Sequence, residues 1–427
     1  GYATAGGGSR RMAIIGAGPI GLELACAAVR RGLDVEIFEK AATIAGHVHD
    51  YRFVRLFSAW KLNMTDLGRS ILTDAGLPIP DEEAYPTGQE LVDAYLEPMA
   101  ASLKKEPLCR GLHMGAEVLF VGRGALLKGE SIGGGDVQMP SGKPLCPHQR
   151  NATPFRLLVR TVATGKEYYC EDFDVVADCS GFYDKQLSNW AGKGGTPALG
   201  ERALRAAGRL WTTIPDVRGK ERQRFAGRRC MVVGAGMSAA TTVRDLVELS
   251  KEEPGTEVIF VTRSGTAPYS VIPDDVLPQR KALCELGNAA SEGAVPGIRY
   301  IGGAAIQEVT EEDGLLRVML QTTAGIQQES VHEVVCCVGY HPDTSIYEEL
   351  QVHQCYASNG PIKLAATLIG GSGDCLKQVA AGADSLKNPE PGFFILGSKS
   401  YGRKSSFLLK IGHEQVLTVL DALTASA

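Results

Sequence analysis

Residues 11–40 carry the pattern that most restricts how this chain can fold. A short apolar run at residues 12–15 predicts a buried strand, and a helical stretch follows at residues 22–31. A second apolar run at residues 35–38 completes a strand–helix–strand unit. This order predicts an α/β fold with a dinucleotide-binding unit at its start.

The turn between the first strand and the helix has the pattern G-x-G-x-x-G, formed by Gly16, Gly18 and Gly21. Gly16 allows the tight turn, Gly18 lets the backbone approach a pyrophosphate, and Gly21 lets the helix pack on the strand. The free N–H groups at the start of the helix would face the phosphates. Pro19 and Ile20, between the last two glycines, belong to the same predicted site.

An acidic residue ends the second strand of this unit. Glu39 lies 18 residues after Gly21 and is placed to accept hydrogen bonds from ribose hydroxyls. Lys40 follows it and is included in the predicted site. The alternative is a strand–helix–strand unit without a ligand, but the ordered combination of glycines, helix and acid favours dinucleotide binding.

A second unit of the same kind begins near residue 228. A strand at residues 230–233 leads into G-x-G-x-x-A, with Gly234, Gly236, Met237 and Ser238 in the predicted site. A helix to about residue 249 and a strand at residues 258–261 follow.

The second unit differs from the first at the end of its second strand. Thr262, Arg263 and Ser264 stand where the first unit has its acid. A guanidinium beside hydroxyls suits a 2′-phosphate better than a free 2′-hydroxyl. An arginine that is simply exposed is the alternative interpretation. Two units with opposite charge at this position imply two different dinucleotides.

Composition limits the remaining possibilities. The chain has 427 residues and a net charge of −5, which gives no electrostatic reason to expect nucleic acid as a partner. No apolar run approaches the roughly 18 residues that a membrane span needs. None of the 11 cysteines is arranged as C-x-x-C, which favours a reducing compartment. His47 and His49 lack accompanying carboxylates or cysteines, so no metal site is predicted.

Residues 1–10 read as a flexible leader, a tag remnant or a processed end. We therefore expect a soluble protein of the cytoplasm, with an organelle as the alternative because the natural N-terminus is undefined.

Shorter patterns predict further elements. Thr87 and Glu90 form a capping box before a helix whose Leu91, Tyr95 and Met99 share one face. Strands are predicted at residues 117–121, 155–161 and 173–177.

The chain resembles the two-dinucleotide-binding-domain flavoproteins, which include pyridine nucleotide-disulfide oxidoreductases and flavin-containing monooxygenases. The resemblance extends from residue 12 to about residue 420 and implies two Rossmann-like domains. FAD would bind the first glycine motif and Glu39, and NADPH the second motif and Arg263. The implied domains are a leader at 1–10, an FAD-binding domain at 11–210 and 336–427, and an inserted NADPH-binding domain at 211–335.

Three further segments carry the resemblance. Residues 174–181 and 333–343 look like the family's paired crossover motifs, and their glycines are Gly181 and Gly339. Residues 392–397 look like the strand that reaches the flavin, with Gly397 followed by Ser398 where the family usually has aspartate. The ribityl contact of that aspartate would here be made by a hydroxyl, a backbone amide or water. Gly373-Asp374 has the same letters in another context, and the role is not transferred to it.

Departures from the family separate its subgroups. A dithiol reductase needs a close cysteine pair, and neither C-x-x-C nor C-x4-C is present. Cys336 and Cys337 are adjacent, but a strand points neighbours to opposite faces. A disulfide reductase is therefore not favoured.

The monooxygenase subgroup is matched in part. Residues 225–230 lack the histidine of its F-x-G-x3-H-x3-W/Y signature. Trp60-Lys-Leu-Asn63 resembles its aromatic-then-asparagine stretch, which implies that Trp60 lies at the flavin and that Asn63 is catalytic beside the isoalloxazine. The alternative is that Asn63 only caps a helix over residues 67–73.

These observations predict an NADPH-dependent FAD monooxygenase that oxygenates a small organic N, S or carbonyl centre through a flavin C4a-hydroperoxide. Its partners would be a small-molecule substrate and molecular oxygen, without nucleic acid or membrane. The alternatives are an NADPH-dependent flavin reductase without oxygen insertion and a redox-responsive nucleotide-binding protein without turnover. The sequence leaves substrate identity and oligomeric state open.

Overall fold

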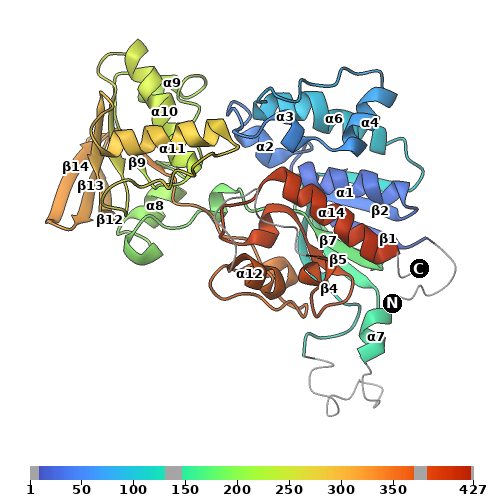
Figure 1. The fold of residues 1–427 in the computed structure, drawn as a ribbon. Coiled ribbons are helices and arrows are strands. Elements are labelled where there is room, and N and C mark those ends of the chain that lie inside the picture. Colours follow the sequence, from blue (N-terminus) through green and yellow to red (C-terminus); the bar gives the residue numbers. More distant parts are fainter. Residues whose placement is uncertain (1–8, 130–146, 370–381, 425–427) are drawn as a thin grey trace. The chain divides into compact units, whose positions relative to one another are not determined.

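The structure is a computed structural model that describes residues 9–129, 147–369 and 382–424. The chain forms two compact units, Gly1–Phe182 with Pro342–Ala427, and Tyr183–His341. The second unit is therefore inserted into the sequence of the first (Figure 1). The predicted domain limits, at residues 210/211 and 335/336, differ from these units because β8 (Leu210–Trp211) and β15 (Glu333–Cys336) pair within the second unit.

The first unit begins with a parallel sheet and its covering helices. Its elements before the insertion are β1 (Arg11–Ile15), α1 (Pro19–Arg30), β2 (Asp34–Glu39), α2 (Gly46–Asp50), α3 (Trp60–Asn63), α4 (Asp66–Asp74), α5 (Gly88–Leu91), η1 (Val92–Leu96), α6 (Glu97–Leu103), β3 (Cys109–Met114), β4 (Ala116–Gly122), α7 (Pro147–Ala152), β5 (Phe155–Thr161), β6 (Glu167–Phe173) and β7 (Val175–Asp178). After it come η4 (Ser345–Tyr347), α12 (Ile362–Ile369), α13 (Ala383–Leu386), β16 (Phe393–Ile395), η5 (Gly397–Tyr401) and α14 (Leu409–Thr424).

Five parallel strands form the centre of the first unit, in the order β16-β7-β1-β2-β3. Helices α1 and α14 lie side by side against one face of this sheet (Figure 1). The antiparallel sheet β4-β5-β6 covers the other face. Between the two sheets, Ile15, Phe155, Phe173 and Phe393 form a core with exposures of 5% or less. The strand order reverses between β1 and β7, which is where open α/β sheets form their ligand crevice.

The second unit repeats this plan. Its elements are η2 (Lys185–Leu187), η3 (Lys193–Gly195), α8 (Glu201–Ala206), β8, α9 (Arg222–Phe225), β9 (Arg229–Val233), α10 (Met237–Glu252), β10 (Glu257–Val261), α11 (Pro278–Ser291), β11 (Ile298–Ile301), β12 (Ala305–Glu312), β13 (Leu315–Thr322), β14 (Gly325–Val331) and β15.

The parallel strands of the second unit have the order β11-β10-β9-β15-β8. Helices α10 and α11 pack on one face and the antiparallel sheet β12-β13-β14 covers the other (Figure 1). Cys336 belongs to the core on the antiparallel-sheet side and Cys337 to the core on the helix side. The prediction that this adjacent pair points to opposite faces is therefore confirmed.

Most predicted local elements are found, and one strand is wrong. The Thr87–Glu90 capping box is present, and Tyr95 lies in a π-helical turn that is buried. The strand predicted at residues 173–177 is two strands, because Phe173 ends antiparallel β6 and Val175 starts parallel β7. The pairing of β6 with β5 is irregular just before this junction, where Asp172 has a φ of 66°.

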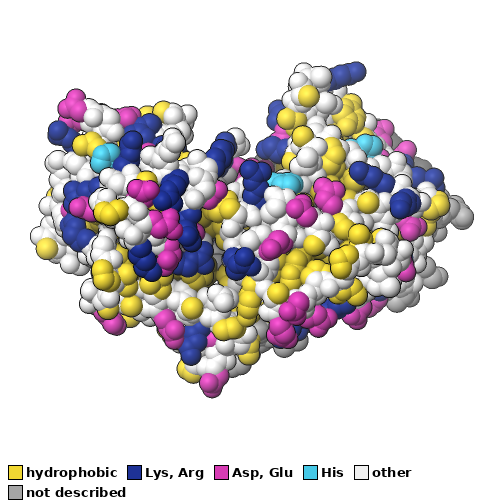
Figure 2. Space-filling model, turned by 90° about the horizontal axis from the view of Figure 1, so that it is seen from above, with side chains coloured by type: hydrophobic (Ala, Val, Ile, Leu, Met, Phe, Trp, Pro, Cys, Tyr) yellow, Lys and Arg dark blue, Asp and Glu magenta, His cyan; other side chains and the backbone are white. Residues whose placement is uncertain are grey.

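Charged side chains of both signs are interspersed on the face drawn in Figure 2. No helix in the described ranges is long and apolar enough to cross a membrane. Within those same ranges, no group of three or more His, Cys, Asp or Glu side chains is arranged to hold a metal ion.

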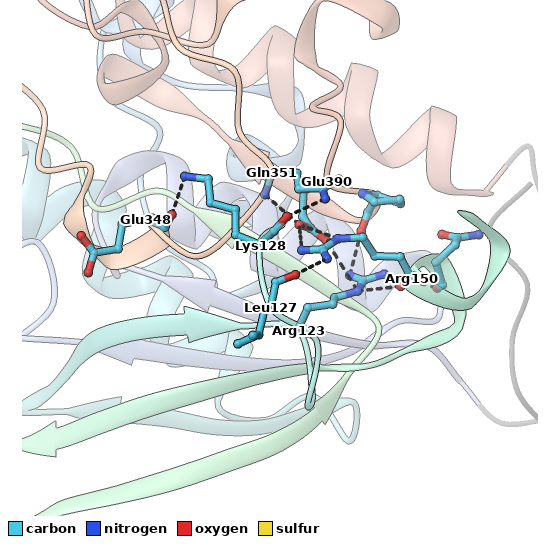
Figure 3. A network of polar contacts seen from close by, with 9 residues as sticks. Arg123, Leu127, Lys128, Arg150, Glu348, Gln351 and Glu390 are labelled. Atoms are coloured by element: carbon cyan, nitrogen blue, oxygen red, sulfur yellow. Dashed lines mark hydrogen bonds and ion pairs between the residues drawn. The ribbon is translucent and has the colours of Figure 1, made fainter. Parts of the chain in front are cut away.

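A buried polar network ties three distant segments of the first unit together (Figure 3). Arg123, at the end of β4, donates to the carbonyl oxygens of Arg150 and Pro391 at 2.8 Å each. Its guanidinium carbon lies 3.9 Å from the centre of the Phe155 ring. The Arg150 side chain in turn binds Glu390. The network therefore joins β4 and α7 to the segment that enters β16.

Candidate functional site

Different structural features explain the three glycines of the first loop. Gly16 has a φ of 97°, and an added Cβ would lie 2.8 Å from the Cys179 carbonyl oxygen. A Cβ on Gly21 would overlap the carbonyl oxygen of Gly16. At Gly18 a Cβ would meet no atom within 4 Å. Gly16 and Gly21 are thus required by packing, whereas the space beside Gly18 is open to a ligand.

Helix α1 starts at this open position. Gly18 is its N-cap and has no side chain to bond the first turn, and Pro19 occupies N1. The N–H groups of Ile20 and Gly21 therefore lack a side-chain cap and can bind an anion, whereas Leu22 N already donates to the Gly18 carbonyl oxygen at 3.0 Å. By contrast, α4 is capped by Thr65, which accepts from Gly68 N at 3.0 Å.

Glu39 ends β2, and its carboxylate binds the backbone of the glycine loop. Its Oε2 accepts from Ala17 N at 2.7 Å and its Oε1 from Ala41 N at 2.8 Å. A carboxylate has about four lone-pair positions, so acceptor capacity remains for ribose hydroxyls. Lys40 instead pairs with Glu117, with Nζ 3.1 Å from Oε1.

The carboxyl ends of β7 and β16 meet beside the same loop. A Cβ on Gly181, where φ is 68°, would lie 3.6 Å from Ser398 Oγ. Gly397 has a φ of 73°, and a Cβ there would lie 3.2 Å from Ile20 Cγ1. The structure therefore brings Gly181, Gly397 and Ser398 together at the start of α1, as the predicted site requires.

An ion pair that the sequence interpretation missed holds these segments. Lys399 Nζ lies 2.6 Å from Asp178 Oδ2, and both side chains are at most 1% exposed. The ammonium also donates to Ser180 Oγ at 3.0 Å, while Asp178 Oδ1 accepts from Ser180 N at 3.0 Å. The family's aspartate position is Ser398, and nothing in the sequence near Lys399 indicates its pairing with Asp178.

Trp60 and Asn63 belong to the short helix α3 and are 5% and 1% exposed. Asn63 Nδ2 donates to the carbonyl oxygens of Ser58 and Ala59 at 2.9 and 3.1 Å. Its Oδ1 accepts from Ser58 Oγ at 2.9 Å. Both N–H groups of the carboxamide are therefore used within the loop that precedes α3. The cap of the next helix is Thr65, not Asn63.

The second glycine loop has the same geometry as the first. Gly234 has a φ of 127°, and a Cβ there would overlap the Cys337 carbonyl oxygen. A Cβ on Gly236 would meet no atom within 4 Å. Gly236 is also the N-cap of α10 and offers no side-chain cap to the first turn, which contains Met237 and Ser238.

Arg263 and Ser264 follow β10 and are both exposed. Within the described ranges, no hydrogen bond or ion pair is made by either side chain. Gly339 has a φ of 85° and follows β15, with a Cβ position 3.3 Å from Asn189 Nδ2. Tyr300 bonds to the turn after β10, and the Tyr269 hydroxyl donates to the Gly236 carbonyl oxygen of the glycine loop; the sequence interpretation selected neither residue.

The thiols of the adjacent cysteine pair are held protonated. Burial raises the pKa of Cys336 and of Cys337 to about 12. Redox-active thiols have lowered pKa values, because the thiolate is the reacting form. All nine cysteines within the described ranges are free.

Comparisons with known proteins agree with this geometry. Residues 14–76 match the family profile described as an NAD(P)-binding Rossmann-like domain. No curated protein matches the chain by sequence. Solved structures match over nearly its whole length. The bacillithiol disulfide reductase of Bacillus cereus has a TM-score of 0.65 at 15% identity, covering 98% of this chain and 100% of that one.

The chain has the fold of the two-dinucleotide-binding-domain flavoproteins. The ornithine N-hydroxylase of Kutzneria sp. 744, solved with reduced FAD, NADP+ and L-ornithine, has a TM-score of 0.59 at 16% identity. This match covers 98% of this chain and 99% of the N-hydroxylase. The cadaverine monooxygenase of Erwinia amylovora, bound to FAD, has a TM-score of 0.60 at 13% identity, with 97% of this chain and 94% of that chain covered.

Proposed function

We propose that the chain is an oxidoreductase that binds FAD in its first unit and NADPH in its second. The observation that carries this proposal is the pair of open positions at Gly18 and Gly236, each at the start of a helix without a side-chain cap. The difference between Glu39 and Arg263 at the following strand ends supports two different dinucleotides.

The residues of the first unit fit FAD. The N–H groups at the start of α1 would bind the pyrophosphate, and the free lone pairs of Glu39 would accept from the ribose. Ser398 replaces the family's aspartate, so its hydroxyl would meet the ribityl chain. The Asp178–Lys399 pair fixes the backbone of both segments that form this part of the site.

The residues of the second unit fit NADPH. The start of α10 would bind its pyrophosphate, and the unpaired guanidinium of Arg263 would bind the 2′-phosphate in a fork of two hydrogen bonds. Bound together, NADPH would supply a hydride and FAD the two-electron chemistry that follows.

For the reaction we propose oxygenation of a small organic N, S or carbonyl centre. The resemblance of residues 60–63 to the monooxygenase pattern supports it, as do the folds of the ornithine N-hydroxylase and the cadaverine monooxygenase named above. Asn63 would act by positioning, because its carboxamide holds the Ser58 and Ala59 carbonyls and thereby the backbone before Trp60.

A second candidate is an NADPH-dependent reductase that does not insert oxygen. The specific observation in its favour is that both Asn63 N–H groups are already donated, which leaves this side chain no donor for a bound oxygen species. A dithiol-dependent disulfide reductase is the less favoured form of reductase, because burial holds the Cys336 and Cys337 thiols protonated.

NADPH oxidation measured with and without oxygen tests the proposal. The purified protein should be yellow and carry one FAD per chain. Oxygen-dependent NADPH consumption that is coupled to a hydroxylated product supports the monooxygenase. Consumption that instead depends on an added quinone or other organic acceptor supports the reductase. Tight binding of both nucleotides without consumption would leave the third alternative, a nucleotide-binding protein without turnover.

A further inference from the structure

The turn after β10 is tied to β11 through a chain of hydroxyl groups. Thr262 Oγ1 lies 2.5 Å from the Tyr300 hydroxyl oxygen, and it donates to the Ser264 carbonyl oxygen at 2.8 Å. Either hydroxyl can be the donor in the Thr262–Tyr300 contact, and the Tyr300 hydroxyl also donates to the Ser264 carbonyl oxygen at 3.1 Å. Tyr300 thus acts on both Thr262 and Ser264, the residues on either side of Arg263.

The backbone of this turn is fixed as well. Thr262 N donates to the Ile301 carbonyl oxygen at 3.1 Å, and Ala304 N donates to the Thr262 carbonyl oxygen at 3.0 Å. A Cβ on Gly302 would overlap the carbonyl oxygen of Gly265. The turn therefore lies directly against the end of β11, with no space in which its backbone can shift toward that strand.

The two side chains that this braced turn presents are unpaired. Arg263 and Ser264 are exposed, and neither side chain bonds to any residue that the structure describes. A backbone held in one conformation reduces the ordering cost when such groups bind a ligand. The fixed backbone of this turn therefore favours binding of an anion at Arg263.

We propose that Tyr300 is a specificity-determining residue that positions Arg263 and Ser264 for the 2′-phosphate of NADPH. This inference rests on the proposed function of the second unit. Tyr300 acts through Thr262 and the Ser264 carbonyl, and its loss should therefore affect only the coenzyme that carries a 2′-phosphate.

A second tyrosine in the same unit provides a matched control. The Tyr269 hydroxyl donates to the Gly236 carbonyl oxygen at 3.3 Å. Its backbone is fixed by Asn288, which accepts from Tyr269 N and donates to Tyr269 O at 2.9 Å each. Because Gly236 belongs to the loop that would face the pyrophosphate, Tyr269 supports a part of the site that NADPH and NADH share.

The test is calorimetric binding of NADP+ and of NAD+ to the purified full chain. Tyr300→Phe should weaken NADP+ binding about 5- to 20-fold, as expected for one or two lost hydrogen bonds. It should change NAD+ binding less than about twofold on the same reasoning. Tyr269→Phe should instead weaken both coenzymes by a similar factor. A general loss of structure would not separate the two coenzymes in this way.

A double-mutant cycle tests whether Tyr300 acts through Arg263. In the Arg263→Ala background, Tyr300→Phe should cause little further loss of NADP+ affinity. Thr262→Val removes the middle hydroxyl at nearly constant volume, and it should reproduce the selective loss if Tyr300→Phe does not fold. Circular dichroism and thermal unfolding of each variant establish its folded state.

The outcomes separate the inference from the function on which it rests. If the wild type binds NADP+ and NAD+ equally, the assignment of NADPH fails and the role of Tyr300 fails with it. If the wild type prefers NADP+ and Tyr300→Phe leaves that preference unchanged, the role of Tyr300 alone is overturned.

Discussion

Glu390 binds Arg150 through both of its carboxylate oxygens, inside the first unit (Figure 3). Arg150 Nη2 donates to Oε2 at 2.7 Å, and Arg150 Nε lies 3.1 Å from each oxygen. Gln351 N donates to the same Oε2 at 2.9 Å, and Arg123 Nε lies 3.7 Å from Oε1. The three charged side chains are at most 3% exposed, so both guanidinium groups and the carboxylate that they face are buried.

Glu390→Gln should therefore lower the free energy of unfolding strongly. The variant keeps the shape of the side chain but removes the carboxylate that faces the guanidinium groups of Arg123 and Arg150. Removing one partner of a buried pair costs about 3–5 kcal/mol. Urea unfolding followed by circular dichroism measures the loss.

Glu83→Gln is the matched control for that experiment. Glu83 pairs with Lys61 at 2.7 Å on the surface, where its side chain is 73% exposed. Exposed pairs contribute about 0–1 kcal/mol, so this variant should unfold almost like the wild type. Equal effects of the two substitutions would contradict a structural role for the buried cluster.

Local patterns were readable from the sequence because they depend on neighbouring residues. The glycines at 16, 18 and 21 are followed by a helix with apolar residues on its buried side, and both features lie within one strand–helix–strand unit. The Thr87–Glu90 capping box is equally local, since its two partners are three residues apart. These elements follow from backbone sterics and periodicity alone.

The parts that were missed depend on distant segments. Asp178 and Lys399 meet only because β7 and β16 pair, and nothing near either residue indicates the other. The second unit begins at Tyr183, and the single bridges that join its first residues to β12, Gly192–Ile306 and Leu199–Glu308, leave no periodic pattern in the sequence. Asn63 shows a third limit of prediction from sequence. The resemblance of residues 60–63 to a family pattern singles out this residue, but it does not indicate which hydrogen bonds the carboxamide makes.

Glu23 should make stability depend on pH. Burial raises the pKa of this carboxyl from 4.5 to about 7, against smaller opposing effects of Thr65 and Arg30. Below pH 4.5 the carboxyl is protonated in both states. Between 4.5 and 7 the unfolded chain releases its proton while the folded protein retains it, so the free energy of unfolding falls as pH rises.

Glu23→Gln should remove this pH dependence. The variant should match the wild type near pH 4 and exceed its stability at pH 8 by about 3 kcal/mol, from roughly 1.4 kcal/mol per pKa unit. Urea unfolding of both proteins across this range measures the difference, in which other titrating groups cancel. A constant difference at all pH values would mean that Glu23 ionises normally in the folded state.

Glu39→Ala should weaken FAD binding. The substitution removes an acceptor from the ribose and also frees the N–H groups of Ala17 and Ala41. A charge-assisted hydrogen bond contributes about 1.5–3 kcal/mol, or roughly 10- to 150-fold in affinity. Flavin fluorescence during titration of the apoprotein measures the affinity. Glu36→Ala, on the same strand but paired with Arg11, should leave it unchanged. Equal retention of flavin by the Glu39 variant would disprove the cofactor assignment.

Arg263→Ala should abolish the preference for NADPH over NADH. The guanidinium has no partner in the described ranges, so its removal costs the fold little while the 2′-phosphate loses its planar donor. The KM for NADPH should rise toward that for NADH, with kcat nearly constant. Steady-state rates with both coenzymes decide the matter, and a wild type that uses them equally well would overturn the prediction.

Asn63→Ala should impair reoxidation of the flavin by oxygen while leaving its reduction by NADPH nearly intact. Asn63 fixes the Ser58 and Ala59 carbonyls, so the variant frees the backbone before Trp60. A displacement of about 1 Å in a group that lines a reacting site can lower a rate up to about 100-fold. Stopped-flow spectroscopy separates the two half-reactions.

Ser58→Ala is the control for Asn63. It removes the hydroxyl that donates to Asn63 Oδ1 at 2.9 Å but leaves both N–H bonds of the carboxamide, and its effect on reoxidation should be smaller. If oxygen reoxidises the wild type slowly, a quinone reoxidises it quickly and Asn63→Ala changes neither rate, Asn63 serves only the fold of its loop. The monooxygenase proposal then fails, and the reductase takes its place.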